Sequence, residues 1–202
     1  PKGVFEMKCM CEKEQLLSSI STVSRLATTR ATLPILQNIY IEAIDGKVIL
    51  RSTDLEQTVE VTVPAEVTES GRLTIPARMI LEYLTNNGDH SLTLESDDLT
   101  LVLTSTNHRA TLKGLPAEEY PTLPAVKSRE KTTFPAHILT QTLNQVLFAA
   151  AVDDTRPVLG GVLWRFSEGS LELVATDGYR LSYAKLPNVS KITGDYIIPR
   201  RA

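Results

Sequence analysis

The chain has 202 residues, of which 42% are hydrophobic and 22% are charged, as is ordinary for a soluble globular protein. No apolar run approaches the about 18 residues of a membrane span, and the start does not resemble a signal peptide, so we expect a cytoplasmic protein. The net charge of −3 argues against a broad basic surface for nucleic acid. This net charge is still compatible with a protein that contacts DNA through a few cationic side chains or that encircles it.

The chain opens with a predicted strand at 7–12 and a helix at 13–27. The helix is indicated by apolar residues at spacings of four, three and four, namely Leu16, Ile20, Val23 and Ala27. A polar loop is expected at 28–33. Strands with β-branched and alternating residues then follow at 39–43, 48–52 and 58–63, and Asp45-Gly46 favours a tight turn between the first two.

A second helix is predicted to start at Pro76 and to end near Asn86. Proline suits the first helical turn because its fixed φ is helical and its missing N–H costs nothing there. Asn87-Gly88 is typical of a helix end. Three alternating strands follow at about 91–95, 99–104 and 108–113, and a proline-rich connection comes next, at Pro116, Pro121 and Pro124.

The second part of the chain repeats the order of the first. Pro135 opens a predicted helix with an apolar stripe, formed by Ile138, Leu139, Leu143, Val146, Leu147 and Ala150. Strands are expected at about 161–166, 171–175 and 179–186, followed by a strand that ends at Ile198. Two helices and mostly antiparallel strands in each copy predict an α+β fold.

A sequence pattern recurs at a fixed offset of 123 residues. Thr32-Leu33-Pro34-Ile35-Leu36 returns as 155–159, and Ile75-Pro76-Ala77-Arg78 returns as 198–201. Aligning 7–79 with 130–202 gives 16 identities in 73 pairs, where composition alone gives roughly four or five. We therefore expect a duplicated domain, with 1–6 as an extension or a cloning remnant, 7–129 as the first domain and 130–202 as a shortened second domain.

The two cysteines, Cys9 and Cys11, lie on one predicted strand and point to the same face, so they cannot easily bridge each other. No histidine forms a metal motif with them. We interpret them as reduced thiols and expect neither a metal site nor a cofactor. No glycine-rich phosphate loop or nucleophile motif is present, so catalysis is not expected.

A Thr-Asp pair occurs once in each copy, as Thr53-Asp54 and Thr176-Asp177. One interpretation is an aspartic-protease-like dyad, which requires two carboxylates within about 3 Å. The other is an aspartate that hydrogen-bonds the turn after a strand. We favour the turn, because a protease site has Asp followed by Thr or Ser and then Gly, whereas here Thr precedes Asp.

Four arginines lie beside predicted helix ends: Arg30, Arg78, Arg200 and Arg201. Each alone is a surface cation, but together they could line a groove that contacts phosphates without reading bases. Tyr179-Arg180-Leu181 differs from its counterpart 56–58. An aromatic, an arginine and a leucine beside a glycine turn suit either a peptide pocket or ordinary loop packing, and the sequence leaves both open.

Several motifs resemble the bacterial β sliding clamp family, the processivity subunit of DNA polymerase III. The segments that carry the resemblance are Met7-Lys8, 32–38, 52–56, 75–78, 115–121, 175–181 and 197–200. The resemblance implies three such domains per subunit and a head-to-tail dimer that encircles duplex DNA, at the nucleoid in the cytoplasm. It also implies a non-catalytic protein that tethers the polymerase.

The resemblance assigns roles by position. Arg30, Arg78, Arg200 and Arg201 would face the DNA. One half of a pocket for peptides of polymerase and clamp-loader proteins would comprise Arg156, Leu159, Thr176, Gly178, Tyr179, Arg180 and Leu181. The edge strand would supply one side of the dimer contact through Asn107, His108, Arg109, Thr111 and Lys113. We expect a chain of this length to close no ring and to bind clamp peptides weakly. A plain protein-interaction module is the alternative, and it predicts no preference for duplex DNA.

Overall fold

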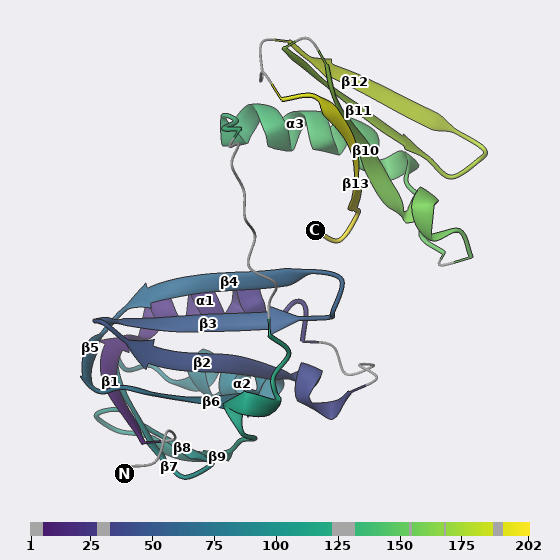
Figure 1. The fold of residues 1–202 in the computed structure, drawn as a ribbon. Helices are drawn as coiled ribbons and strands as arrows, with labels where there is room; N and C mark the ends of the chain where they lie inside the picture. The colour runs from purple at the N-terminus through teal and green to yellow at the C-terminus, as the bar shows by residue number, and fades with distance from the viewer. Residues whose placement is uncertain (1–5, 28–32, 123–131, 154, 168, 188–191) are drawn as a thin grey trace. The chain divides into compact units, whose positions relative to one another are not determined.

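The computed structural model describes residues 6–27, 33–122, 132–153, 155–167, 169–187 and 192–202. The chain divides into two compact units, unit 1 at Pro1–Pro124 and unit 2 at Ala125–Ala202 (Figure 1). Among the described residues, no helix has both the length and the apolar character to cross a membrane.

Unit 1 consists of two antiparallel sheets and two α-helices. The first sheet has the strand order β5-β1-β7-β8-β9, and the second has the order β4-β3-β2-β6. The bounds of the first sheet's strands are β1 (Met7–Glu12), β5 (Glu66–Glu69), β7 (Ser91–Asp97), β8 (Thr100–Thr104) and β9 (Arg109–Lys113). Those of the second are β2 (Asn38–Ile44), β3 (Lys47–Thr53), β4 (Thr58–Pro64) and β6 (Gly71–Pro76). Short 3-10 helices η1 (Pro34–Gln37) and η2 (Ala117–Glu119) flank them.

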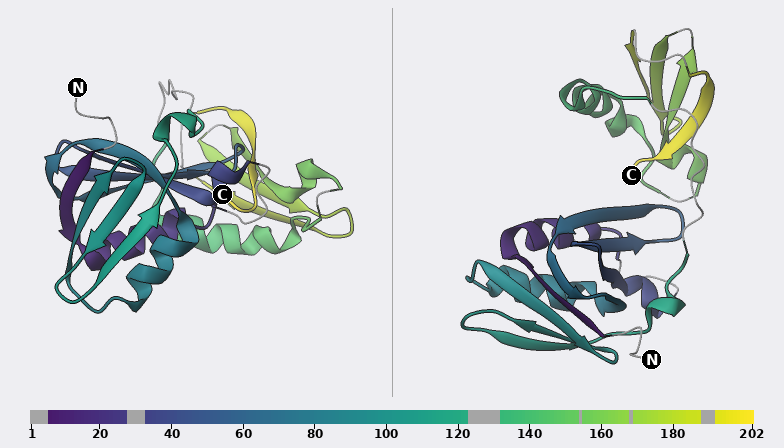
Figure 2. Two further views of the ribbon diagram at one scale, coloured as in Figure 1. Left: turned by 90° about the horizontal axis from the view of Figure 1, so that it is seen from below. Right: turned by 60° about the vertical axis from the view of Figure 1, so that its left-hand side comes forward.

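The two α-helices of unit 1 pack against each other and against both sheets (Figure 2). They are α1 (Lys13–Val23) and α2 (Ala77–Asn86). The helix predicted at 13–27 therefore ends earlier than expected. After Val23 the amides of Arg25, Leu26 and Ala27 bond to the carbonyls three residues back, so the chain leaves the helix in tight 3-10-type turns.

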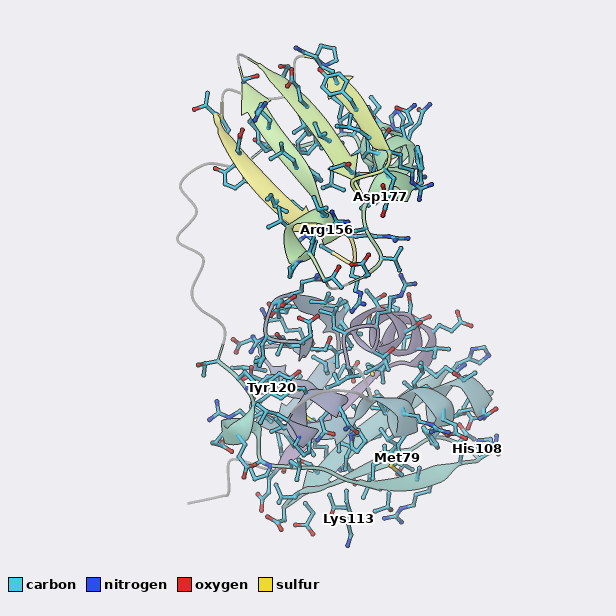
Figure 3. All side chains as sticks on the ribbon, turned by 90° about the vertical axis from the view of Figure 1, so that its right-hand side faces the viewer. Met79, His108, Lys113, Tyr120, Arg156 and Asp177 are labelled. Carbon is cyan, nitrogen blue, oxygen red and sulfur yellow. The ribbon has the colours of Figure 1, made fainter. Side chains whose placement is uncertain are left out.

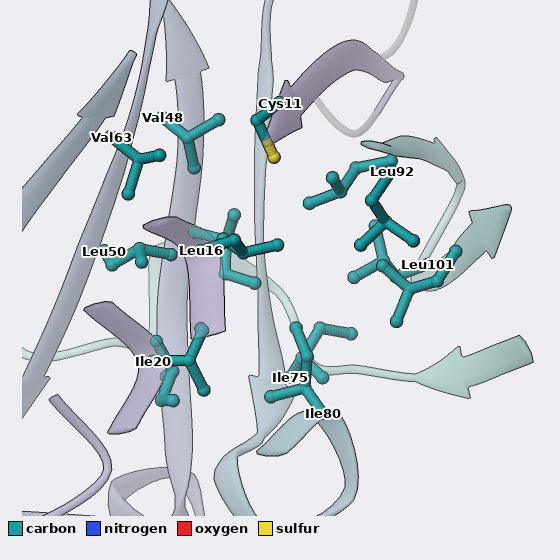
Figure 4. Close-up of a cluster of buried hydrophobic side chains, with 14 of the residues drawn as sticks. Cys11, Leu16, Ile20, Val48, Leu50, Val63, Ile75, Ile80, Leu92 and Leu101 are labelled. Atoms are coloured by element: carbon teal, nitrogen blue, oxygen red, sulfur yellow. The ribbon is translucent and has the colours of Figure 1, made fainter. Parts of the chain in front are cut away.

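The core of unit 1 lies between the two sheets and the helices. Leu16 and Ile20 of α1, Ile80 of α2 and Leu50 of β3 are each fully buried (Figure 4). Cys9 and Cys11 share the buried face of β1, as the alternation predicts. Burial raises the pKa of the Cys9 thiol to about 12, so both cysteines serve as small apolar core residues.

Unit 2 repeats the second sheet of unit 1 with the same strand order, β12-β11-β10-β13. Its elements are α3 (Ala136–Val146), η3 (Leu147–Ala149), η4 (Pro157–Gly160), β10 (Gly161–Ser167), β11 (Ser170–Thr176), β12 (Leu181–Leu186) and β13 (Gly194–Pro199). The register is also preserved, because Asn38 pairs with Pro76 in unit 1 and Gly161 pairs with Pro199 in unit 2. For the four strands of this sheet, the sequence repeat is thus a structural repeat.

One pair of neighbouring positions differs in side-chain size between the two copies, and the two differences compensate each other. In unit 1 the buried Asn38 side chain donates a 2.9 Å hydrogen bond to Thr74 Oγ1. Their counterparts in unit 2 are Gly161 and Ile197, and a Cβ on Gly161 would lie 2.6 Å from Ile197 Cγ2. The missing side chain at one position makes room for the larger one at the other.

Unit 2 has no counterpart of the first sheet among its described residues. Thr132 to Pro135, which align with the end of β1, form no strand. In unit 1 this strand is held by β5 and β7, and the counterpart of β7 would begin at 91 + 123 = 214, past residue 202 of this sequence. Tyr196, on the core-facing side of β13, is 50% exposed, whereas its counterpart Leu73 is fully buried.

Candidate functional site

The turn between β11 and β12 is closed by the side chains of Thr176 and Asp177. Thr176 Oγ1 donates to the Arg180 carbonyl at 2.7 Å and accepts the Gly178 amide at 3.1 Å. Asp177 Oδ1 accepts the amides of Tyr179 and Arg180, each at 3.0 Å. These backbone donors, together with the Arg180 side chain, hold the pKa of the Asp177 carboxyl below its ordinary value. These hydrogen bonds fix the backbone of the turn and with it the positions of Tyr179 and Arg180.

The equivalent turn in unit 1 has the same hydrogen bonds. Thr53 Oγ1 donates to the Gln57 carbonyl at 2.7 Å, and Asp54 Oδ1 accepts the Gln57 amide at 2.7 Å. Leu55, with φ +77°, occupies the position that Gly178 fills with φ +92°. Both aspartates accept hydrogen bonds from the backbone of their own turns, which confirms the turn interpretation.

Arg156 joins the segment before η4 to this turn. Its Nη2 donates to the Asp177 carbonyl at 3.1 Å (Figure 3), and a Cβ added to Gly178 would lie 3.0 Å from its Nη1. The same segment positions Leu159, whose amide bonds to the Arg156 carbonyl and whose carbonyl accepts the Ala151 amide. The structure thus brings the seven predicted pocket residues of unit 2 into one region.

Phe148 on η3 is part of this region, although the sequence analysis missed it. Its ring lies under the Arg180 guanidinium, 5.5 Å from ring centroid to Cζ, and it is 56% exposed. Arg180 also donates from Nε to Asp177 Oδ2 at 2.9 Å. A signal was present, because the counterpart of Phe148 in the first copy is Arg25, and divergence between the copies had already indicated 179–181.

Three apolar side chains are exposed around the turn. Tyr179 at its tip is 97% exposed, Leu181 at the start of β12 is 66% exposed, and Val158 on η4 is 65% exposed. A rigid turn that holds large apolar groups in water is suited to bind a partner, since their burial is favourable and the turn loses little entropy.

The open edge of the first sheet of unit 1 contains the predicted dimer residues. β9 pairs with β8 alone among the described strands. Hydrogen bonds from Ser105 to His108 and from Gly114 to Leu99 fix the alternation at its two ends. In an antiparallel pair this alternation leaves the amides and carbonyls of Arg109, Thr111 and Lys113 facing away from β8. Their side chains are exposed as well.

Asn107 and His108 lie in the turn before β9 and not on the strand. Both bond to the Asp89 carboxylate, Asn107 through its amide at 3.0 Å and His108 through Nδ1 at 3.2 Å. Hydrogen bonds from Ser105, Asn107 and His108 hold the pKa of the Asp89 carboxyl well below its usual range.

The predicted DNA-facing arginines are exposed where the structure describes them. Arg78 lies in the first turn of α2, and Arg200 and Arg201 follow β13. None of the three forms an ion pair with another described residue. Arg30 lies outside the described residues. The helices carry little charge, with Lys13 and Glu14 on α1 and Arg78 and Glu82 on α2.

Two family models match the chain in succession. Residues 7–124 match the DNA polymerase III beta subunit, N-terminal domain, and residues 133–202 match the central domain of the same subunit. The chain belongs to the DNA polymerase III beta subunit family. The α+β fold of duplicated clamp domains that the sequence predicts is confirmed by this match and by the solved structures below.

Relatives extend the comparison. The chain is 36% identical over 190 residues to the beta sliding clamp of Synechocystis, covering 90% of this chain and 49% of that protein. It is 29% identical over 207 residues to the Staphylococcus aureus beta sliding clamp, covering 97% and 55% respectively. The chain thus spans about half the length of the curated relatives it matches.

Solved clamps have the same fold. The DNA polymerase sliding clamp of Bacillus subtilis superposes with a TM-score of 0.91 at 26% identity, over 97% of this chain and 55% of that one. The DNA polymerase III beta subunit of Pseudomonas aeruginosa gives 0.89 at 28% identity, over 96% and 54%.

Proposed function

We propose that these residues form part of a DNA sliding clamp, a non-catalytic processivity factor that encircles duplex DNA and tethers the replicative polymerase in the cytoplasm, at the nucleoid. The observation that carries the proposal is the succession of two clamp domains of one family, in which the second sheet of unit 1 and the sheet of unit 2 share one strand order. In this proposal 7–129 and 130–202 are consecutive domains of a ring-forming homodimer.

The helices of unit 1 are suited to lie beside DNA without holding it. The solvent-facing side of α1 is mainly hydroxyl-bearing, with Ser18, Ser21 and Thr22 exposed. Arg78 on α2 supplies a cation that no described carboxylate neutralises. Few cations mean few released counterions, so the contact with phosphates is weak and depends only shallowly on salt, as sliding requires. Arg30, Arg200 and Arg201 are proposed to contribute in the same way.

The rigid turn of unit 2 is proposed as one half of a pocket for peptides of polymerase and clamp-loader subunits. Its support is the geometry around Arg156, Thr176 and Asp177, which keeps Tyr179 and Leu181 exposed. Exposed aromatic and leucine side chains on a fixed backbone are typical anchors for an apolar peptide segment.

The edge of β9 is proposed as one side of the subunit contact. The outward backbone groups of Arg109, Thr111 and Lys113 are paired with no other described strand, and they can pair with a strand of another subunit. The exposed Arg109 and Lys113 would favour a partner strand with acidic residues.

A processivity assay tests the proposal. A subunit of the length of the relatives, carrying these residues, should lengthen the products that its replicative polymerase makes from a primed circular template when a clamp loader and ATP are present. We expect no effect when the loader is omitted at low clamp concentration. Product lengths that do not change with the complete system would contradict the proposal.

Neutralising one DNA-facing cation should have a modest and specific effect. In Arg78→Ala the slope of log affinity for duplex DNA against log salt should fall by about one, because one phosphate contact is lost. Arg165→Ala is the matched control, since Arg165 lies on a sheet and is ion-paired with Asp195 at 2.9 Å. Binding isotherms at four or more salt concentrations measure both slopes, and equal slopes for Arg78→Ala and wild type would remove Arg78 from the DNA contact.

A further inference from the structure

A polar network joins the connection after α2 to the β8–β9 turn, and its centre is Asp89. The carboxylate is only 12% exposed although it lies on a surface loop. Its Oδ1 accepts Asn107 Nδ2 at 2.9 Å, and its Oδ2 accepts the Asn107 amide at 3.0 Å and lies 3.2 Å from His108 Nδ1. One side chain therefore secures two consecutive residues of the turn.

Asp89 is itself held by a buried residue. Its amide donates to Asn87 Oδ1 at 2.8 Å, and Asn87 is only 3% exposed. Asn87 Nδ2 in turn donates to Ser105 Oγ at 3.1 Å and to Tyr83 Oη at 3.2 Å. The carboxylate is thus fixed relative to both α2 and the end of β8, so it can transmit a defined position to the turn.

The turn leads directly into the open edge. His108 precedes Arg109, the first residue of β9, and its carbonyl accepts the Ser105 amide at 2.9 Å. Because β9 is paired on one side only among the described strands, its position at this end depends on β8 and on the contacts of Asn107 and His108 with Asp89. A strand pairing across a subunit contact needs its outward amides in a fixed register.

We propose that Asp89 is the positioning residue of the β9 edge: it fixes the β8–β9 turn so that the outward backbone groups of 109–113 are ready to pair with a strand of a second subunit. This inference rests on the proposed subunit contact at β9. It assigns to a residue outside that contact the task of keeping the contact surface ordered before association.

The test compares Asp89→Asn with Asp97→Asn. The amide variant keeps the shape of Asp89 but replaces one acceptor oxygen by a donor and removes the charge, so it cannot accept all the present bonds. Asp97 ends β7 at the β7–β8 turn of the same sheet, and its exposed side chain makes no hydrogen bond or ion pair with the described residues. It is therefore a matched control for loss of a surface carboxylate.

Amide hydrogen exchange on the 202-residue chain measures directly how well the β8–β9 turn and the start of β9 are ordered. In Asp89→Asn we expect exchange at the amides of Asn107, which donates to Asp89, and Ala110, which faces β8, to rise about tenfold. This rise corresponds to loss of a charge-assisted hydrogen bond, while α1 and β2 exchange as in wild type. Asp97→Asn should leave these two amides unchanged. Unchanged exchange in Asp89→Asn, or a uniform rise throughout unit 1, would overturn the proposal.

Dimerisation of a subunit of the relatives' length separates this inference from the proposed function. Sedimentation should show a dissociation constant about tenfold higher for Asp89→Asn than for wild type and Asp97→Asn. A wild-type dimer that Asp89→Asn leaves equally tight contradicts the role of Asp89 alone. A wild type whose assembly is insensitive to charge reversal at Arg109 and Lys113 contradicts the β9 contact itself and this inference with it.

Discussion

Gly114→Ala should destabilise unit 1 by about 3 kcal/mol, the upper range for forcing atoms into a packed site. A Cβ on Gly114 would lie 2.1 Å from the Thr74 carbonyl oxygen. Thr74 and Leu115 exchange two backbone hydrogen bonds of 3.0 Å beside it, which fasten the end of β9 to β6. Since the obstacle is backbone, no side-chain rotation relieves it, and the bridge must open.

Gly88→Ala is the control for this substitution. Nothing lies within 4 Å of a Cβ built on Gly88, and its φ is not in the left-handed region. Urea unfolding of both variants, followed by circular dichroism, should show a lower midpoint for Gly114→Ala and a wild-type midpoint for Gly88→Ala. Equal midpoints would contradict the close contact between Gly114 and the Thr74 carbonyl of β6.

Leu181→Ala should weaken the binding of a clamp-binding peptide by about 2 kcal/mol, or roughly 30-fold, if the rigid turn of unit 2 forms half of the pocket. Hot-spot side chains at the centre of an interface typically contribute this much. Leu181 is 66% exposed before binding, and its loss leaves the hydrogen bonds of Thr176 and Asp177 in place. The effect should therefore appear in affinity and not in Tm.

Leu55→Ala is the matched control for Leu181→Ala. Leu55 is 57% exposed in the equivalent turn of unit 1, where 56–58 replace the aromatic-arginine-leucine segment. Fluorescence anisotropy with a labelled polymerase peptide and a subunit of the relatives' length measures both affinities. A loss as large for Leu55→Ala, or none for Leu181→Ala, would place the pocket elsewhere.

Much of the fold could be predicted from local pattern, because the repeat ties each prediction to a second copy. Alternating valines predict β4, Asp45-Gly46 predicts a turn in which both residues have positive φ, and Pro76 predicts the start of α2. The predicted end of α1 was wrong. Ala27 continues the helical spacing of apolar residues, which suggested a helix to residue 27, but the chain leaves the helix after Val23 and buries Leu26.

The candidate site was predictable only in part. Thr176, Asp177 and Gly178 carry turn chemistry that depends on neighbours along the chain, so the sequence predicts it. Phe148 and Arg180 meet through tertiary folding across 32 residues, counted as 180 − 148, and no local pattern encodes that contact. The contacts of Asp89 are not predictable from local sequence either. Its sequence neighbourhood is that of an ordinary surface carboxylate, and Asn107 and His108 reach it only through the folding of the β8–β9 turn.

Retention on closed DNA tests the sliding-clamp account most directly. A subunit of the relatives' length, carrying these residues, would be loaded onto a nicked circular plasmid, separated from unbound protein, and divided into samples with and without a restriction enzyme that cuts once. The protein should stay on the circle at a salt concentration that abolishes binding to linear DNA, and it should leave within minutes of linearisation. Equal retention on the circular and cut plasmids would contradict it.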